Sequence, residues 1–224
     1  MSIQNKLFAT AATVVLFMAA SAVASPPAGA ATPQCGPHCI QVFSAKFGTP
    51  DSPTFVESVF RGLPVAGVPT ILAGPSSFNP AGDMIVRAAG TVSTFYAAGM
   101  VSAAVNSHYG TERAVQIEYA PHGVPTGLCA AVATAAYQNE GLTLQPCQTP
   151  GTTVFIIDTA NSPATAPTYF PIVIGNTTDF VHPFAMTIHG DPAHKPLPQI
   201  TIQHLRRNPT NVPLNQLWGA NVFN

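Results

Sequence analysis

Turn-forming residues divide this chain into short apolar segments, and this feature limits its fold more than any other. Clusters of glycine, proline, asparagine and aspartate recur, as in GTPDSP at 48–53 and HGDPAHKP at 189–196. Short strands separated by such turns predict an all-β sandwich or barrel. The expected strands cover residues 39–43, 70–72, 84–86, 114–119, 142–144, 154–157, 171–174, 184–188 and 200–205.

Two alanine-rich segments compete with this interpretation. Ala98–Ala104 and Ala130–Ala136 favour a helix by intrinsic propensity. Neither segment has a wide amphipathic stripe, so we expect strands or short turns of helix there. No charged, low-complexity linker divides the mature chain, and residues 35–224 are therefore expected to form one domain.

The scarcity of charge excludes several classes of protein. Only 8% of the 224 residues are charged and the net charge is −1, whereas an average soluble domain is about 25% charged. A disordered chain needs low hydrophobicity and high net charge, but 46% of this chain is hydrophobic. Nucleic-acid binding needs a basic patch that neutralises phosphates. We therefore expect a globular protein with no nucleic-acid partner.

The N-terminus predicts export. Residues 1–24 have the pattern of a secretory signal peptide, with Lys6 before the apolar stretch Leu7–Ala20 and small residues in Ala22-Val-Ala24. Cleavage after residue 30 is the alternative, and 25–34 form a Pro/Ala-rich leader. A retained membrane anchor needs roughly 20 apolar residues. The stretch here has about 14, so we expect a secreted, extracellular protein with no membrane contact after the signal is removed.

Export gives the four cysteines a structural meaning, because an even number in an oxidising compartment normally forms disulfides. Sequence order favours Cys35–Cys39 and Cys129–Cys147 among the three connectivities, since each pair encloses a local segment. The alternative is that Cys35, His38 and Cys39 form half of a zinc site. Zinc takes four ligands, and no second CxxC or HxxxH segment supplies the rest. No metal and no cofactor are expected.

A three-fold pattern runs through the mature chain. Three alternating segments, Gly67–Leu72, Gly141–Leu144 and Pro198–Ile202, are each followed by a polar loop and a second apolar strand. Three residues take equivalent core positions in those closing strands: Ile85, Phe155 and Trp218.

The segment 127–147 resembles a ricin-type β-trefoil lectin repeat. It contains Gly127-Leu-Cys129-Ala-Ala-Val132, a turn at Asn139-Glu-Gly141 and the second cysteine of the pair, Cys147. Gln216-Leu-Trp218 similarly resembles the Gln-x-Trp that closes such repeats. The resemblance implies a single β-trefoil-like domain, with about twelve strands in three pseudo-repeats and a hydrophobic centre.

The same resemblance implies a sugar site, but the sequence departs from it. Sugar-binding repeats hold an aspartate where this chain has Ala131, which has no acceptor. Other residues offer acceptors near an aromatic ring: Asp179 with Phe180 and His182, or Asp83 with Asn79. The competing interpretation makes each of them a turn residue or a loop cap.

Catalytic patterns are not found. No G-x-S-x-G turn occurs, and Ser76 and Ser77 do not fit it. Nine acidic residues include no obvious facing pair for glycosidic chemistry. Glu118 lies on an alternating strand, where it either points into a cleft or faces solvent. The histidine-rich segment 182–194 contains metal-capable side chains but lacks the H-E-x-x-H arrangement. We expect no catalytic residues.

These observations predict a secreted, non-catalytic binding protein that is ricin-type lectin-like and recognises an extracellular carbohydrate or protein. Two alternatives remain open. One is a secreted metal-dependent hydrolase that uses the 182–194 His/Asp loop. The other is a trefoil-type enzyme inhibitor. The sequence favours no oligomeric state.

Overall fold

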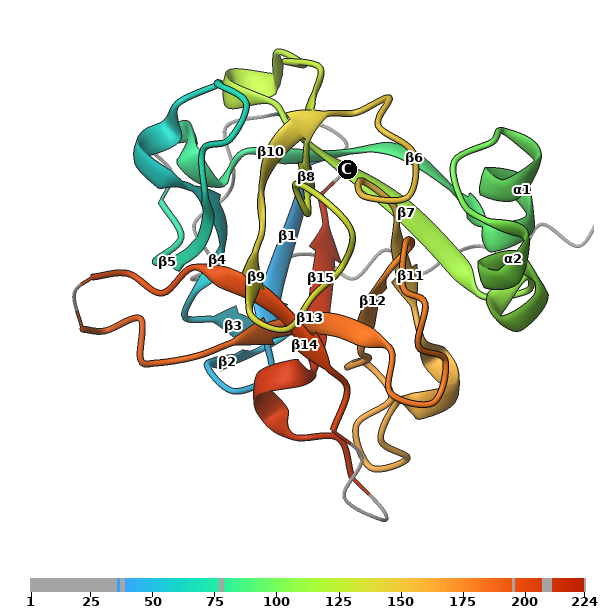
Figure 1. Ribbon diagram of the computed structural model, residues 1–224. Helices are drawn as coiled ribbons and strands as arrows, with labels where there is room; N and C mark the ends of the chain where they lie inside the picture. The colour runs from blue at the N-terminus through green and yellow to red at the C-terminus, as the bar shows by residue number, and fades with distance from the viewer. Residues whose placement is uncertain (1–35, 37–38, 77–78, 195, 207–210, 224) are drawn as a thin grey trace, which may run out of the picture.

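The computed structural model describes residues 36, 39–76, 79–194, 196–206 and 211–223 (Figure 1). The expected signal peptide at 1–24, its alternative cleavage after residue 30 and the leader at 25–34 lie outside the described residues. Cys35 and His38 also lie outside them. Within the described part of the chain, no helix has both the length and the hydropathy of a membrane span.

Twelve strands form three units of four. The first unit contains β1 (Cys39–Ser44), β4 (Val56–Val59), β5 (Thr70–Ala73) and β6 (Met84–Thr91). The second contains β7 (Arg113–Tyr119), β8 (Leu128–Ala131), β10 (Thr143–Pro146) and β11 (Phe155–Ile157). The third contains β12 (Ile172–Ile174), β13 (Phe184–Ile188), β14 (Ile200–His204) and β15 (Trp218–Val222). The strands expected from the turn pattern all lie within or overlap these strands.

Short elements fill the connections. Three further strands have two residues each: β2 (Gly48–Thr49), β3 (Ser52–Pro53) and β9 (Glu140–Gly141). Five 3₁₀ turns are described as well: η1 (Phe60–Gly62), η2 (Pro80–Gly82), η3 (Pro121–Gly123), η4 (Thr159–Asn161) and η5 (Leu214–Gln216).

The first and fourth strands of the units close into a barrel. β1 pairs with β6, β6 with β7, β7 with β11 and β11 with β12, all antiparallel. A bridge from Phe170 to Trp218 and the pairing of β15 with β1 complete the ring. In Figure 1, β1 and β15 lie side by side at the centre of the molecule. Closure leaves the barrel without an unpaired edge.

Three hairpins, β4–β5, β8–β10 and β13–β14, cover one end of the barrel. They meet through backbone hydrogen bonds that repeat from unit to unit. Thr70 N donates to Leu142 O at 3.0 Å, and Leu142 N donates to Ile200 O at 2.8 Å. A six-stranded barrel with three hairpins in three-fold pseudo-symmetry is the β-trefoil fold, and the chain is an all-β protein of this kind.

The register of the barrel identifies the equivalent core residues. Met84 pairs with Ile40 and Tyr119, and Phe155 holds the same place between Val115 and Ile174. Trp218 lies likewise between Phe170 and Ser44.

The first-unit equivalent of Phe155 and Trp218 is therefore Met84 rather than the expected Ile85. Met84, Phe155 and Trp218 are all fully buried in the central core. Ile85 is half-buried and packs against a small cluster of Cys39 and Phe223. A shift of one residue along a strand moves a side chain to the opposite face, which explains the difference.

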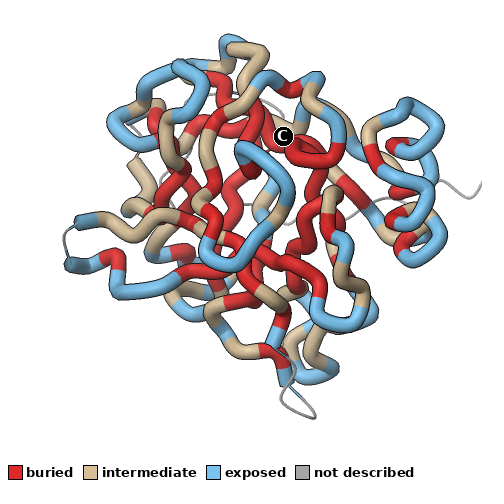
Figure 2. Tube along the Cα trace, viewed as in Figure 1, coloured by how far each residue is buried: buried red, intermediate tan, exposed pale blue. Residues whose placement is uncertain are grey.

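The central core is uneven among the three units. The buried (red) residues in Figure 2 follow the inner strands. Leu72, Leu144 and Ile202 hold equivalent core positions, as the shared hydrogen-bond pattern of the hairpins shows. The first unit places two polar residues in positions that are apolar in the other units. Glu57 is equivalent to Ala130 and Met186, and Thr70 is equivalent to Leu142 and Ile200.

A helical hairpin joins the first two units. α1 (Val92–Ala97) begins at the N-cap Thr91, and α2 (Ala103–Tyr109) begins at the N-cap Ser102. The expected segment Ala98–Ala104 is mostly the turn between these helices, while Ala130–Ala136 is the end of β8 and a loop. The short helices are held by packing, because Val92, Phe95, Val105 and Tyr109 bury against the outside of the barrel.

One of the two expected disulfides lies within the described residues. Cys129 and Cys147 are bonded to each other, with an S–S distance of 2.06 Å, and they join β8 to the turn that directly follows β10. The pairing that we expected from sequence order is confirmed for this bond. Cys39 is also disulfide-bonded.

Candidate functional site

A shallow hollow on the surface of the first unit gathers polar side chains. Its cavity volume is about 30 Å³, room for about two water molecules and far below the about 300–1,000 Å³ of small-molecule pockets. We call it the first-unit hollow. It lies between the hairpin β4–β5, strand β1 and the turn η2, and its polar lining consists of Gln41, Ser58, Ser76, Asn79 and Asp83.

The three-fold register relates this hollow to the lectin motif. Val56 of the first unit pairs with Phe43. Cys129 takes the same place in the second unit, where it pairs with Glu118, and Ala185 takes it in the third. Two residues further along, Ser58, Ala131 and Thr187 are therefore equivalent. These are the positions where ricin-type repeats hold their sugar-binding aspartate, and none of the three is a carboxylate.

The hydroxyl groups of Ser58 and Thr187 each donate a hydrogen bond to a backbone oxygen of their own strand. Ser58 Oγ donates to Val56 O at 3.3 Å, and Thr187 Oγ1 donates to Ala185 O at 3.0 Å. Of these three residues, Ser58 is the one that lines the first-unit hollow. An alignment of Val56–Val59 with Cys129–Val132 would have found Ser58 from the sequence.

Asp83 and Asn79, which the sequence offered as a pair, meet in this hollow. Asp83 is buried, and its Oδ2 accepts a hydrogen bond from His122 N at 2.9 Å. Asn79 Oδ1 accepts from Ala81 N at 3.0 Å and so begins η2. Both side chains therefore hold loops, as the competing interpretation expected, and both residues line the hollow.

The other candidates, Asp179, Phe180 and His182, lie in the loop between β12 and β13 but do not converge. Asp179 Oδ1 accepts from Val181 N and His182 N, both at 2.9 Å, which makes it a turn residue. The hydrogen bond from His182 N is the main cause that lowers the pKa of Asp179. Phe180 stacks on His108 of α2 with ring centroids 5.0 Å apart.

His182 contributes its backbone rather than its ring to this region. Its carbonyl oxygen lies 2.5 Å from His204 Nδ1, and the His204 ring stacks on Phe184. Asp179 Oδ2 is 3.7 Å from His204 Nδ1. These contacts hold the loop between β12 and β13 in place. The sequence did not indicate the contact of His204 with this loop, because His204 is 22 residues from His182 in the chain.

The histidine-rich loop gathers two ligand-type side chains rather than a complete set. His194 Nδ1 lies 3.1 Å from Asp191 Oδ2, and both side chains are exposed. Across the part of the chain that the structure describes, no group of three or more His, Cys, Asp or Glu side chains could hold a metal ion. The geometry therefore offers no support for the metal-dependent hydrolase.

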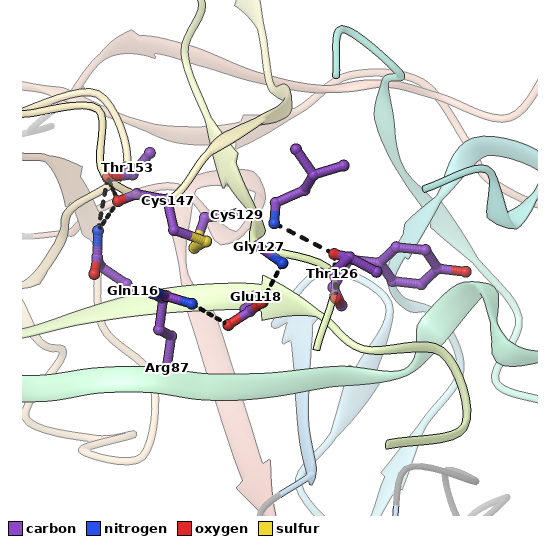
Figure 3. A network of polar contacts seen from close by, with 10 residues as sticks. Arg87, Gln116, Glu118, Thr126, Gly127, Cys129, Cys147 and Thr153 are labelled. Atoms are coloured by element: carbon purple, nitrogen blue, oxygen red, sulfur yellow. Dashed lines mark hydrogen bonds and ion pairs between the residues drawn. A yellow bond between two sulfur atoms is a disulfide. The ribbon is translucent and has the colours of Figure 1, made fainter. Parts of the chain in front are cut away.

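Glu118 neither points into a cleft nor faces solvent. It is buried, accepts an ion-paired hydrogen bond from Arg87 Nη1 at 2.8 Å and a second bond from Gly127 N at 2.6 Å (Figure 3). On the same strand, Gln116 Nε2 donates to Cys147 O at 2.7 Å and to Thr153 Oγ1 at 2.8 Å. This network, which flanks the Cys129–Cys147 disulfide, connects β6, β7 and the loops of the second unit.

Comparisons with known proteins support the fold. The chain is similar to the designed 3-fold symmetric protein ThreeFoil, with 10% sequence identity and a TM-score of 0.52 over 83% of this chain and 99% of that chain. It is also similar to the mdaA-1 domain, with 10% identity and a TM-score of 0.50 over 86% and 97%. At these identities the likeness concerns the fold alone.

A salivary protein from Culex of the Cysteine and Tryptophan-Rich family is more distant, with 12% identity and a TM-score of 0.46 over 87% of this chain and 98% of that chain. No protein-family model and no curated protein matches the sequence. The trefoil fold implied by the ricin-type resemblance is thus confirmed, and membership of the lectin family remains a prediction.

Proposed function

We propose that this chain is a secreted, non-catalytic β-trefoil protein that binds an extracellular carbohydrate or protein through the first-unit hollow. The observation that carries the proposal is the place of this hollow. It lies beside Ser58, at the position where a ricin-type repeat binds its sugar. Hydroxyl, amide and carboxyl groups from Ser58, Asn79 and Asp83 suit the hydrogen-bonding groups of a neutral ligand.

The lining of the hollow also favours binding over catalysis. Asp83 is the single carboxylate among the described lining residues, whereas glycoside hydrolysis generally uses two carboxyl groups on opposite sides of the scissile bond. One oxygen of Asp83 already accepts a hydrogen bond from His122 N. Ser76 Oγ likewise accepts from Asn79 N, so this hydroxyl helps to hold the turn before η2.

A substitution that fills the hollow tests the proposal. Ala73 lines it and is half-buried, so the indole of Ala73→Trp would occupy its mouth. Gln145 is the equivalent residue of the second unit, because it pairs with Cys129 as Ala73 pairs with Val56. Gln145→Trp is therefore a matched control of the same size.

Retention on a glycan array and on insoluble polysaccharides is the measurement. We expect the wild type and Gln145→Trp to be retained and Ala73→Trp to lose retention. If the folded wild type is retained on no glycan, the carbohydrate part of the proposal is wrong, and pull-down of protein ligands with the same variants then tests the protein part. Equal binding by the Ala73→Trp and Gln145→Trp variants would overturn the assignment to this hollow.

A further inference from the structure

A second hollow lies at the opposite end of the barrel from the hairpins. Its cavity volume is about 470 Å³. Barrel ends are frequent places for ligand sites. We call it the barrel-end hollow. It is lined by Ala89, Gly90, Thr91, Thr94, Arg113, Ala114, Val115 and Ile157.

Strand register explains why Arg113 points there. Val115 packs against the central core, and its neighbour across the ladder is Phe155, which is fully buried in that core. Side chains two residues apart lie on the same face of a strand, so Arg113 and Ile157 face the same side, one step nearer the barrel end. Arg113 pairs with Thr91 on one flank and with Ile157 on the other. The guanidinium therefore stands between a hydroxyl and an apolar wall.

The charge of Arg113 is not neutralised within the described residues. Its side chain is exposed and forms no ion pair or hydrogen bond there, whereas the Arg87 side chain on the neighbouring strand is paired with Glu118. The adjacent carboxylate, Glu112, bonds instead to Thr159, with Oε2 2.8 Å from its Oγ1. A guanidinium presents a fork of donors that matches a carboxylate or a phosphate.

Two hydroxyl groups complete the polar side of the hollow. Thr91 Oγ1 and Thr94 Oγ1 lie 3.1 Å apart, and Thr91 Oγ1 also accepts from Thr94 N at 3.2 Å. A pair of hydroxyls that share one hydrogen bond still has one O–H to donate. Ala89 and Gly90 line the hollow beside them, and Thr94 packs closely against Gly90, where an added Cβ would lie 3.2 Å from Thr94 Cβ.

We infer that the barrel-end hollow binds a small ligand through an oxyanion, a carboxylate or a phosphate group, which is held by the Arg113 guanidinium and the Thr91–Thr94 hydroxyl pair. This site is separate from the first-unit hollow, and the inference does not depend on the proposed function.

Titration calorimetry of the purified protein tests the inference with three probes: galacturonate, inorganic phosphate and galactose. Galacturonate carries a carboxylate that galactose lacks, so a difference in their binding assigns recognition to the carboxylate rather than to the sugar ring. Inorganic phosphate tests whether the oxyanion is a phosphate instead. We expect at least one anion to bind. Arg113→Gln should weaken that binding by about 10- to 100-fold, the usual contribution of a hydrogen bond to a charged group. Arg113→Lys should weaken it less.

Matched variants make the result specific. Arg61→Gln removes an exposed arginine outside the hollow, one whose guanidinium lies over the Phe60 ring, and should leave anion binding unchanged. Ala73→Trp, which fills the first-unit hollow, should leave anion binding unchanged as well. The result for the barrel-end hollow is therefore independent of whether the first-unit hollow binds a ligand. Because Arg113 is exposed, its variants should fold normally. Binding of neither anion, or equal binding by Arg113→Gln and Arg61→Gln, would overturn the inference.

Discussion

Glu57 on β4 pairs with Leu72 on β5, and its carboxyl group is buried with no hydrogen-bond partner in the described structure. The strands and the turn packed against β4, namely β1, β5 and η2, have no charged side chain. Burial raises the pKa of Glu57 from 4.5 to about 7. A carboxylic acid thus replaces the apolar residue that the second and third units use at this core position.

The first prediction concerns stability and pH. The unfolded chain loses the Glu57 proton near pH 4.5, while the folded protein keeps it until about pH 7. The stability that Glu57 contributes is therefore complete below pH 4.5 and is lost as the pH rises to about 7. The loss approaches about 3 kcal/mol, at 1.36 kcal/mol for each pKa unit.

Denaturant unfolding at several pH values measures this loss. The chain has one tryptophan, Trp218, which is fully buried, so its fluorescence reports unfolding. Glu57→Gln does not titrate and should show a flatter pH profile between pH 4.5 and 7. A parallel pH dependence of the wild type and Glu57→Gln would mean that Glu57 has a partner when folded.

The second prediction concerns Thr70, whose hydroxyl is buried and has no hydrogen-bond partner among the described residues. Thr70→Val keeps the shape and removes the unsatisfied hydroxyl, so we expect the free energy of unfolding to rise by about 1 kcal/mol. Thr187→Val is the matched control, because the Thr187 hydroxyl donates to Ala185 O and accepts from Gln216 Nε2. That variant should lose about 1–3 kcal/mol. Changes of the same sign would contradict this account.

The third prediction concerns the Cys129–Cys147 disulfide, whose cysteines are 18 residues apart. Replacement of both cysteines with alanine should lower the free energy of unfolding by about 3 kcal/mol, because the bond restricts the unfolded chain. Mass spectrometry of a non-reduced digest should recover this pair and Cys35–Cys39. A peptide that joins Cys35 to Cys129 would refute both pairings.

The fourth prediction concerns the ion pair between Arg87 and Glu118. Glu118 is almost fully buried, while the Arg87 side chain is 35% exposed. A double-mutant cycle with Arg87→Met and Glu118→Gln should give a coupling energy of about 1–2 kcal/mol. Since the carboxylate is buried, salt should reduce the coupling only slightly. A coupling near zero would mean that Gly127 N alone satisfies Glu118.

Several features could be predicted from the sequence because they depend on local patterns. Apolar runs between turns identified the strands, as in Phe184–Ile188, whose expected bounds match β13. The spacing of Cys129 and Cys147 and the closing tryptophan, Trp218, led to the trefoil. Such patterns reflect burial and turn chemistry, which act over a few residues.

The tertiary structure decided which face each residue takes and which distant residues meet. Whether Met84 or Ile85 enters the core depends on strand register, since neighbouring side chains alternate between faces. The environment of Glu57 is set by three hairpins that meet only in the folded barrel. The pairing of Arg113 with Thr91 and Ile157 depends on the same closure, so the local sequence determined the strands while the long-range pairing determined the sites.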